Sequence, residues 1–164
     1  QVAYGSRKVK NLSKPVRGHL AKTELESAAL LREFRVPSAE IDAYEAGSAI
    51  TVAALEGVSL VDVTATSKGR GFTGGMKRHN MSGAATMTHG THEAFRHGGS
   101  IGACAYPGRV WKGQRMAGQM GSKRVTIQNV EIVRVDTERN LVLVRGGVAG
   151  PRNGIVMLRP AVKK

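Results

Sequence analysis

Runs of β-branched and aliphatic residues mark one part of the chain as strand-forming. Two such stretches follow each other at 48–55 ("SAITVAAL") and 58–67 ("VSLVDVTATS"), and Glu56-Gly57 joins them. Val, Ile and Thr are enriched in strands, and a glycine between two such runs favours a turn. We therefore predict two strands in this region.

Three further strands are predicted in the C-terminal quarter of the chain. Residues 124–136 alternate in their second half, where Val130, Ile132 and Val133, near Val135, are expected on one side and Glu131, Arg134 and Asp136 outward. The stretches 140–150 and 154–162 follow, separated by the turn-forming sequence "PRNG". Five strands with short connections are typical of a small β-barrel, here residues 46–66 and 124–162.

Helical signals are fewer. Residues 22–34 ("KTELESAALLREF") predict a helix, and residues 74–80 predict one or two helical turns that end before Ser82-Gly83. From Met81 to Ser122 no period of either kind is sustained. A stretch of that length without regular structure usually has a functional reason.

These patterns predict a mainly β protein with a long insertion. The expected body comprises residues 1–66 and 124–164, with 14–45 as an insertion within it. The expected extension, residues 67–123, is a Gly-rich, basic and mostly irregular loop.

Charge separates the same regions. The formal net charge is +13, which favours a polyanionic partner, nucleic acid first and an anionic membrane surface second. Residues 67–124 carry ten Lys or Arg against one acid, Glu93, whereas residues 23–62 carry two against eight. Like charges at that density repel, so we expect residues 81–122 to become ordered only when an anion neutralises them. No run approaches the roughly 18 apolar residues of a membrane span.

A nucleotide-dependent enzyme is one alternative. The stretch "GRGFTG", Gly69 to Gly74, matches the glycine spacing of a dinucleotide-binding loop and follows a predicted strand. Such a site needs a long helix whose N-terminus receives the pyrophosphate, and Ser82-Gly83 would end a helix here after about two turns. The sequence therefore gives this interpretation little support.

A metal site and a nucleophile are weaker alternatives. His79, His89, His92, His97 and Cys104 provide only one closely spaced pair, whereas zinc needs four converging ligands. Cys104 or Ser100 lacks an orienting acid other than Glu93. We therefore predict no catalytic residue, no metal site and no cofactor apart from Mg²⁺ held by RNA.

RNA binding accounts for more of the insertion than these alternatives do. Glycines allow close approach to phosphates, Lys and Arg neutralise them, and aromatic or His rings stack on unpaired bases. Tyr106 and Trp111 equally fit local packing that stiffens the loop. A free-standing RNA chaperone or regulator remains a further alternative.

Long stretches of the chain resemble one family. "VDVTATSKGRGFTGGMKRHN", "THGTHEAFRHGGSIG", "YPGRVWKGQRMAGQMGSKRVTIQNVEIVRVDTERNLVLVRGGVAGPRNG" and "VMLRPAVKK" look like the large-subunit ribosomal protein L3 family of the bacterial type. "KPVRGHLAK" and "LREFRV" are similar to it as well. An N-terminal strand-rich segment that this family usually has is not found in the sequence.

The resemblance implies a translation-protein-type β-barrel and a long extension that runs through large-subunit rRNA toward the peptidyl transferase centre. It implies a structural, non-enzymatic role in the large subunit, early in assembly, with rRNA and neighbouring ribosomal proteins as partners and no membrane or small-molecule substrate. The expected location is the cytoplasmic ribosome of a bacterium, with an organellar ribosome as the alternative. Several members carry a methylated glutamine where this chain has Ala105, so no modification is expected there.

From charge and resemblance together we predict a set of rRNA-binding residues. Two groups lie on either side of the acidic stretch 24–56, which we expect to face solvent or a basic neighbour. They are Lys8, Lys10, Lys14, Arg17, Lys68, Arg70, Lys77, Arg78, His79, His89, His92, Arg96, His97, Arg109, Trp111, Lys112, Arg115, Lys123 and Arg124.

Overall fold

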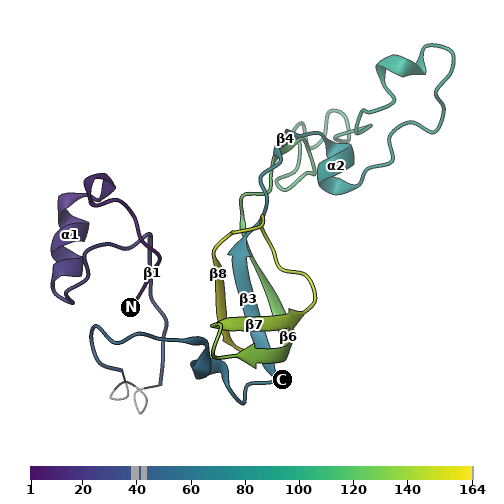
Figure 1. Ribbon diagram of the computed structural model, residues 1–164. Coiled ribbons are helices and arrows are strands. Elements are labelled where there is room, and N and C mark those ends of the chain that lie inside the picture. Colours follow the sequence, from purple (N-terminus) through teal and green to yellow (C-terminus); the bar gives the residue numbers. More distant parts are fainter. Residues whose placement is uncertain (38–40, 42–43, 164) are drawn as a thin grey trace. The chain divides into compact units, whose positions relative to one another are not determined.

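The computed structural model describes residues 1–37, 41 and 44–163. The chain groups into two compact units, Gln1–Ala54 and Leu55–Lys164 (Figure 1). Each unit has its own hydrophobic cluster, so each is described by itself.

The first unit combines a short strand pair with a helix. Strands β1 (Val2–Tyr4) and β2 (Leu30–Arg32) are antiparallel, and Val2 lies opposite Arg32. The 3₁₀ turn η1 (Val9–Asn11) and the helix α1 (Lys14–Ala21) lie between them in the sequence. Leu12, Leu20 and Ala28 form the buried cluster of this unit.

The helix predicted at 22–34 is wrong. The helix lies just before it, at α1, where Pro15 occupies the first turn and its missing N–H costs nothing. After α1 the chain turns at Glu24, whose φ is 58°, and then pairs with β1 as strand β2. Pairing with β1 thus outweighs the helix propensity of "ELESAALLRE".

The second unit contains a four-stranded antiparallel sheet in the order β7-β6-β3-β8. Its strands are β3 (Leu60–Thr66), β6 (Arg124–Asp136), β7 (Leu141–Arg145) and β8 (Val156–Pro160). All four lie where the sequence predicted strands, which confirms a mainly β fold. Val61, Val63 and Val130 form the core of the sheet.

The fifth predicted strand, 48–55, is not a strand. Its second half forms the 3₁₀ turn η3 (Val52–Leu55). Leu55 and Val58 pack against the core of the sheet, and Val58 N–H donates to the Leu55 carbonyl at 3.2 Å. Of this segment, Leu55 therefore contributes an apolar side chain to the core without joining a ladder.

The sheet is open in the described residues, so a closed barrel is not confirmed. The edges of the sheet are β7 and β8. Two register shifts, at Val61/Val63 and at Ile132/Arg134, interrupt the ladders of the long strand β6. Such bulges bend a strand and increase its twist.

Asp62 stabilises the first of these bulges. Its side chain is fully buried, accepts the Asn129 N–H at 3.2 Å and pairs with Arg159 at 3.2 Å. Asn129 has a φ of 56°, which asparagine tolerates better than most residues. A buried carboxylate thus holds three strands in register.

Candidate nucleic-acid interface

The extension, residues 67–123, leaves the sheet at the end of β3 and returns at the start of β6 (Figure 1). It contains strand β4 (Gly71–Thr73), helix α2 (Gly75–His79), the 3₁₀ turn η4 (Thr91–Glu93) and strand β5 (Gly118–Met120). Helix α2 confirms the helical turns predicted at 74–80. Strands β4 and β5 were not predicted.

The two ends of the extension are held together by backbone hydrogen bonds. We call these ends, residues 67–73 and 118–123, the neck. Ser67 N–H donates to the Lys123 carbonyl at 2.9 Å, and Ser122 N–H donates to the Ser67 carbonyl at 3.2 Å. Beyond them β4 and β5 pair antiparallel, with Phe72 opposite Gln119.

Gly121 shows how closely the two ends of the neck approach. Its φ is 74°, and a Cβ placed on it would lie only 1.9 Å from the Lys68 carbonyl oxygen. Any side chain at this position would force the two segments apart. The neck therefore depends on a glycine here.

A second connection between the two sides of the extension lies beyond the neck, farther from the sheet along the chain. Arg78 Nη1 donates to the Met116 carbonyl at 2.8 Å, and His79 Nε2 lies 3.0 Å from the same oxygen. Because the oxygen accepts, the His79 Nε2 must carry the proton. Both side chains come from the last turn of α2 and are half-buried. We call this arrangement the brace.

All the other predicted rRNA-binding residues have exposed side chains. Lys8, Lys10, Lys14 and Arg17 lie in the first unit, and the rest lie on the extension or at its ends. The ion pairs found in the described residues involve Arg134, Arg145 and Arg159, all on strands of the sheet. The cations of the extension thus carry charges that no described acid neutralises by an ion pair.

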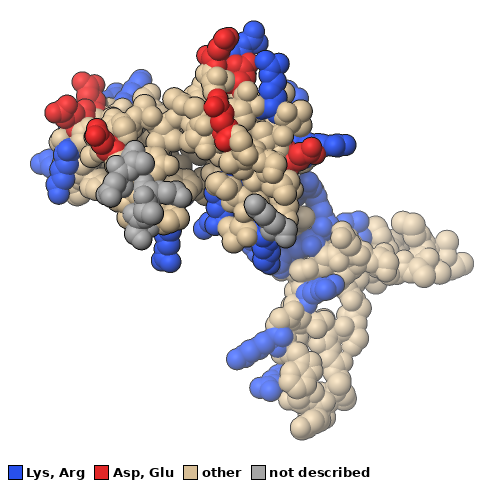
Figure 2. All heavy atoms as spheres, turned by 90° about the horizontal axis from the view of Figure 1, so that it is seen from below, with Lys and Arg blue, Asp and Glu red and all other residues tan. Residues whose placement is uncertain are grey.

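Figure 2 shows the same separation of charge. Blue Lys and Arg side chains stand out from the extension, while the red acidic side chains visible in this view lie over other parts of the chain. Neutralising such an uncompensated set of charges favours association with a polyanion.

Aromatic side chains on the extension are also exposed. Tyr106 is 90% exposed and Phe72 79%. The Arg109 guanidinium carbon lies 5.3 Å from the centre of the Trp111 ring, within cation–π distance. The predicted local stiffening by Trp111 and its predicted stacking on a base are both compatible with this contact, because Trp111 is still 59% exposed.

The alternative sites weighed in the sequence analysis have the following geometry in the described residues. Gly71–Thr73 is strand β4, and α2 has five residues, so "GRGFTG" does not open the long helix that a dinucleotide loop needs. Among the described residues no group of three or more His, Cys, Asp or Glu is placed to hold a metal ion. Cys104 is exposed. No helix of the described chain is long and apolar enough to cross a membrane.

Two features of this region were missed from the sequence. The Met116 carbonyl, which organises the brace, is a backbone atom 37 residues from His79, and no local pattern identifies such an acceptor. The loop between β7 and β8 carries the exposed Arg152 and approaches the neck. The absence of acidic residues from 139–163 is the feature of the sequence that could have indicated a role for this loop.

A small sheet domain with a glycine-rich extension of unpaired cations is typical of proteins that bind polyanions. Comparison with known proteins identifies the family within this class. The family model of ribosomal protein L3 matches residues 19–140. The chain belongs to the ribosomal protein L3 family, whose members are structural components rather than enzymes.

Several bacterial proteins are similar to this chain. The large ribosomal subunit protein uL3 of Colwellia psychrerythraea is 51% identical over 166 residues, covering 99% of this chain and 76% of that protein. The proteins of the same name from Marinomonas sp. and Vibrio cholerae are each 50% identical over 163 residues. They cover 99% of this chain, and 76% and 77% of those proteins.

Proposed function

We propose that this protein is a structural component of the large ribosomal subunit, located in the cytoplasm, and that it binds large-subunit rRNA mainly through the extension. The observation that carries the proposal is the set of exposed cations on residues 67–124 that lack an ion-pair partner among the described residues. Membership of the L3 family and relatives named large ribosomal subunit proteins support it.

In this proposal the sheet is a rigid footing and the extension penetrates the RNA. The cations contact phosphates, and His89, His92, His97 and Trp111 contact bases or sugars. Lys8, Lys10, Lys14 and Arg17 form a second contact, and the acidic stretch faces solvent or a basic ribosomal protein. Mg²⁺ enters only with the RNA.

Two finer roles belong to the same proposal. The protein joins the subunit early in assembly, and the tip of the extension reaches toward the peptidyl transferase centre. The β-barrel implied by the resemblance requires further strands along the edges β7 and β8.

Charge reversal on the extension tests the proposal. We expect Arg109→Glu, Lys112→Glu and Arg115→Glu together to reduce incorporation into the large subunit severalfold, because three phosphate contacts become repulsive. Quantitative mass spectrometry of purified subunits measures the incorporated fraction. Arg32→Glu, Arg35→Glu and Arg139→Glu, three exposed cations outside the predicted rRNA-binding set, provide a control with the same change of charge. Equal incorporation of the first variant and the unmodified chain contradicts the proposal.

A further inference from the structure

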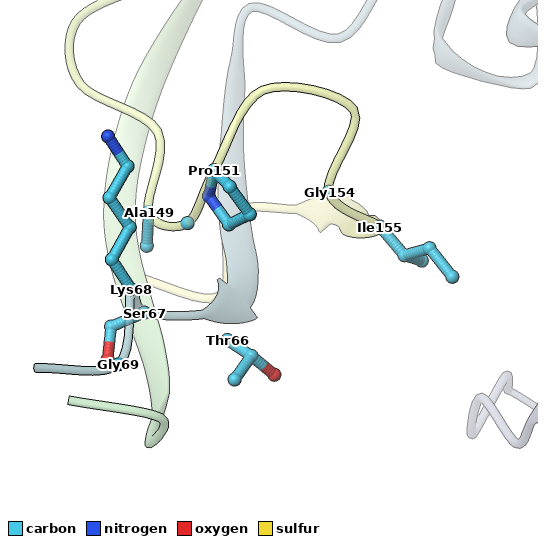
Figure 3. A pocket seen from close by; sticks show the side chains of 9 residues that line it. Thr66, Ser67, Lys68, Gly69, Ala149, Pro151, Gly154 and Ile155 are labelled. Carbon is cyan, nitrogen blue, oxygen red and sulfur yellow. The ribbon is translucent and has the colours of Figure 1, made fainter. Parts of the chain in front are cut away.

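A cavity of about 450 Å³ lies where the neck meets the sheet (Figure 3). One wall comes from the end of β3 and the start of the extension. The other comes from the loop between β7 and β8. The lining residues are Thr66, Ser67, Lys68, Gly69, Ala149, Gly150, Pro151, Gly154 and Ile155.

Backbone contacts fix both walls of this cavity. Gly150 has a φ of 101°, and a Cβ there would lie 2.7 Å from the Thr66 carbonyl oxygen, so the loop touches the end of β3 directly. Gly154 N–H donates to the Pro151 carbonyl at 3.1 Å, which closes the turn. The backbone of the two walls is therefore held close together at this point.

The chemistry of the cavity is apolar inside and cationic at the edge. Ala149, Pro151 and Ile155 present aliphatic carbon, whereas Lys68 is exposed and Arg152 follows Pro151 in the loop. The two lining segments lie within 63–92 and 139–163, and neither of these stretches contains an acidic residue. A ligand that fits has a flat apolar body and an anionic group.

We propose that this cavity receives one unpaired nucleotide of the bound RNA. The base packs against Ala149 and Pro151, and the phosphate is held by Lys68. An unpaired nucleotide exposes both its base and its phosphate, whereas bases in a duplex are stacked and covered. The inference rests on the proposed function, because the RNA must reach the neck for a nucleotide to enter.

Filling the cavity tests this inference. Ala149→Phe places a ring where the base would lie, and it changes no charge. We expect the full chain with this substitution to bind a large-subunit rRNA transcript about tenfold more weakly, the size of one lost base-stacking contact. The slope of log K against log salt should become less steep by at most about one, because Lys68 holds a single phosphate. Ala46→Phe, an exposed alanine in the first unit, is the matched control.

The outcomes separate the two proposals. Weaker binding by Ala149→Phe, with Ala46→Phe and the unmodified chain alike, supports the cavity site. Equal binding by all three overturns the cavity site and leaves the proposed function intact. Absence of salt-dependent rRNA binding by the unmodified chain overturns both.

A second measurement does not depend on a variant folding correctly. Adenosine monophosphate is added to the unmodified chain, and backbone amide signals are followed by nuclear magnetic resonance. We expect saturable shifts at Gly150, Gly154 and Ile155 at millimolar concentration. Shifts of the same size with inorganic phosphate alone would identify a simple anion site, and no shift with the nucleotide would equally overturn the inference.

Discussion

Lys77 and Arg78 are neighbours on α2, yet their side chains have different surroundings. Lys77 is exposed, whereas Arg78 is half-buried and donates to the Met116 carbonyl at 2.8 Å. Arg78 also lies against Gly118, where an added Cβ would be 2.6 Å from its Nη1. Charge and spacing in the sequence place both residues in one RNA-binding set. The tertiary contact assigns Arg78 a role inside the extension.

Salt dependence distinguishes these two roles. The slope of log K against log salt for rRNA binding is negative. We expect Lys77→Ala to reduce its magnitude by about one, as for one lost phosphate contact. Arg78→Ala should leave that slope nearly unchanged. It should instead weaken the brace, seen as faster amide hydrogen exchange around Gly118. If both variants reduce the magnitude of the slope by about one relative to the unmodified chain, Arg78 contacts a phosphate.

At the scale of elements, prediction from sequence succeeded where the local preference of the residues agrees with the structure that they adopt in the fold. Strand β3 is buried on both faces and is a continuous run of apolar and β-branched residues, with Asp62 as the exception. Prediction failed where a partner far along the chain decides. Pairing with β1 makes 30–32 a strand, and residues 52–55 form a 3₁₀ turn whose last residue, Leu55, packs against the core of the sheet. Helix α1 was not predicted because it contains Gly18 and Pro15, which both have a low propensity for a helix interior.

The buried Asp62 gives the element scale its own prediction. Removing its partner by Arg159→Met leaves a carboxylate without its counter-charge between β3, β6 and β8. We expect the free energy of unfolding to fall by about 2 kcal/mol, within the range for a buried charge that loses a half-exposed partner. Urea denaturation measures it.

A double variant provides the internal check. Asp62→Asn keeps an acceptor for the Asn129 N–H and removes the charge. Added to Arg159→Met, it should restore part of the lost stability, because the amide is less costly to bury than a lone carboxylate. If the two effects simply add, the coupling free energy between Asp62 and Arg159 is zero and the ion pair does not stabilise the sheet.

At the scale of the molecule, the extension divides into a held part and an open part. The neck and the brace connect its two ends by hydrogen bonds between residues 37 to 56 positions apart in sequence. Residues 99–113 contain no helix or strand and carry Tyr106, Arg109 and Trp111 exposed. The expectation that residues 81–122 are ordered only with RNA is therefore refined, because residues 116–122 belong to the held part.

Hydrogen exchange on the free chain and on its complex with an rRNA transcript tests this division. Without RNA, the amides of Ser67, Arg70 and Ser122 should exchange slowly, because each donates to a backbone carbonyl across the neck. Amides within 99–113 should exchange within seconds, and RNA should slow them at least tenfold while it changes the neck little. Gly121→Ala should abolish protection of the neck in the free chain, since its Cβ would meet the Lys68 carbonyl. Uniformly fast exchange of residues 67–123 without RNA would show that the neck forms only on the RNA, and that the cavity beside it is not formed in advance.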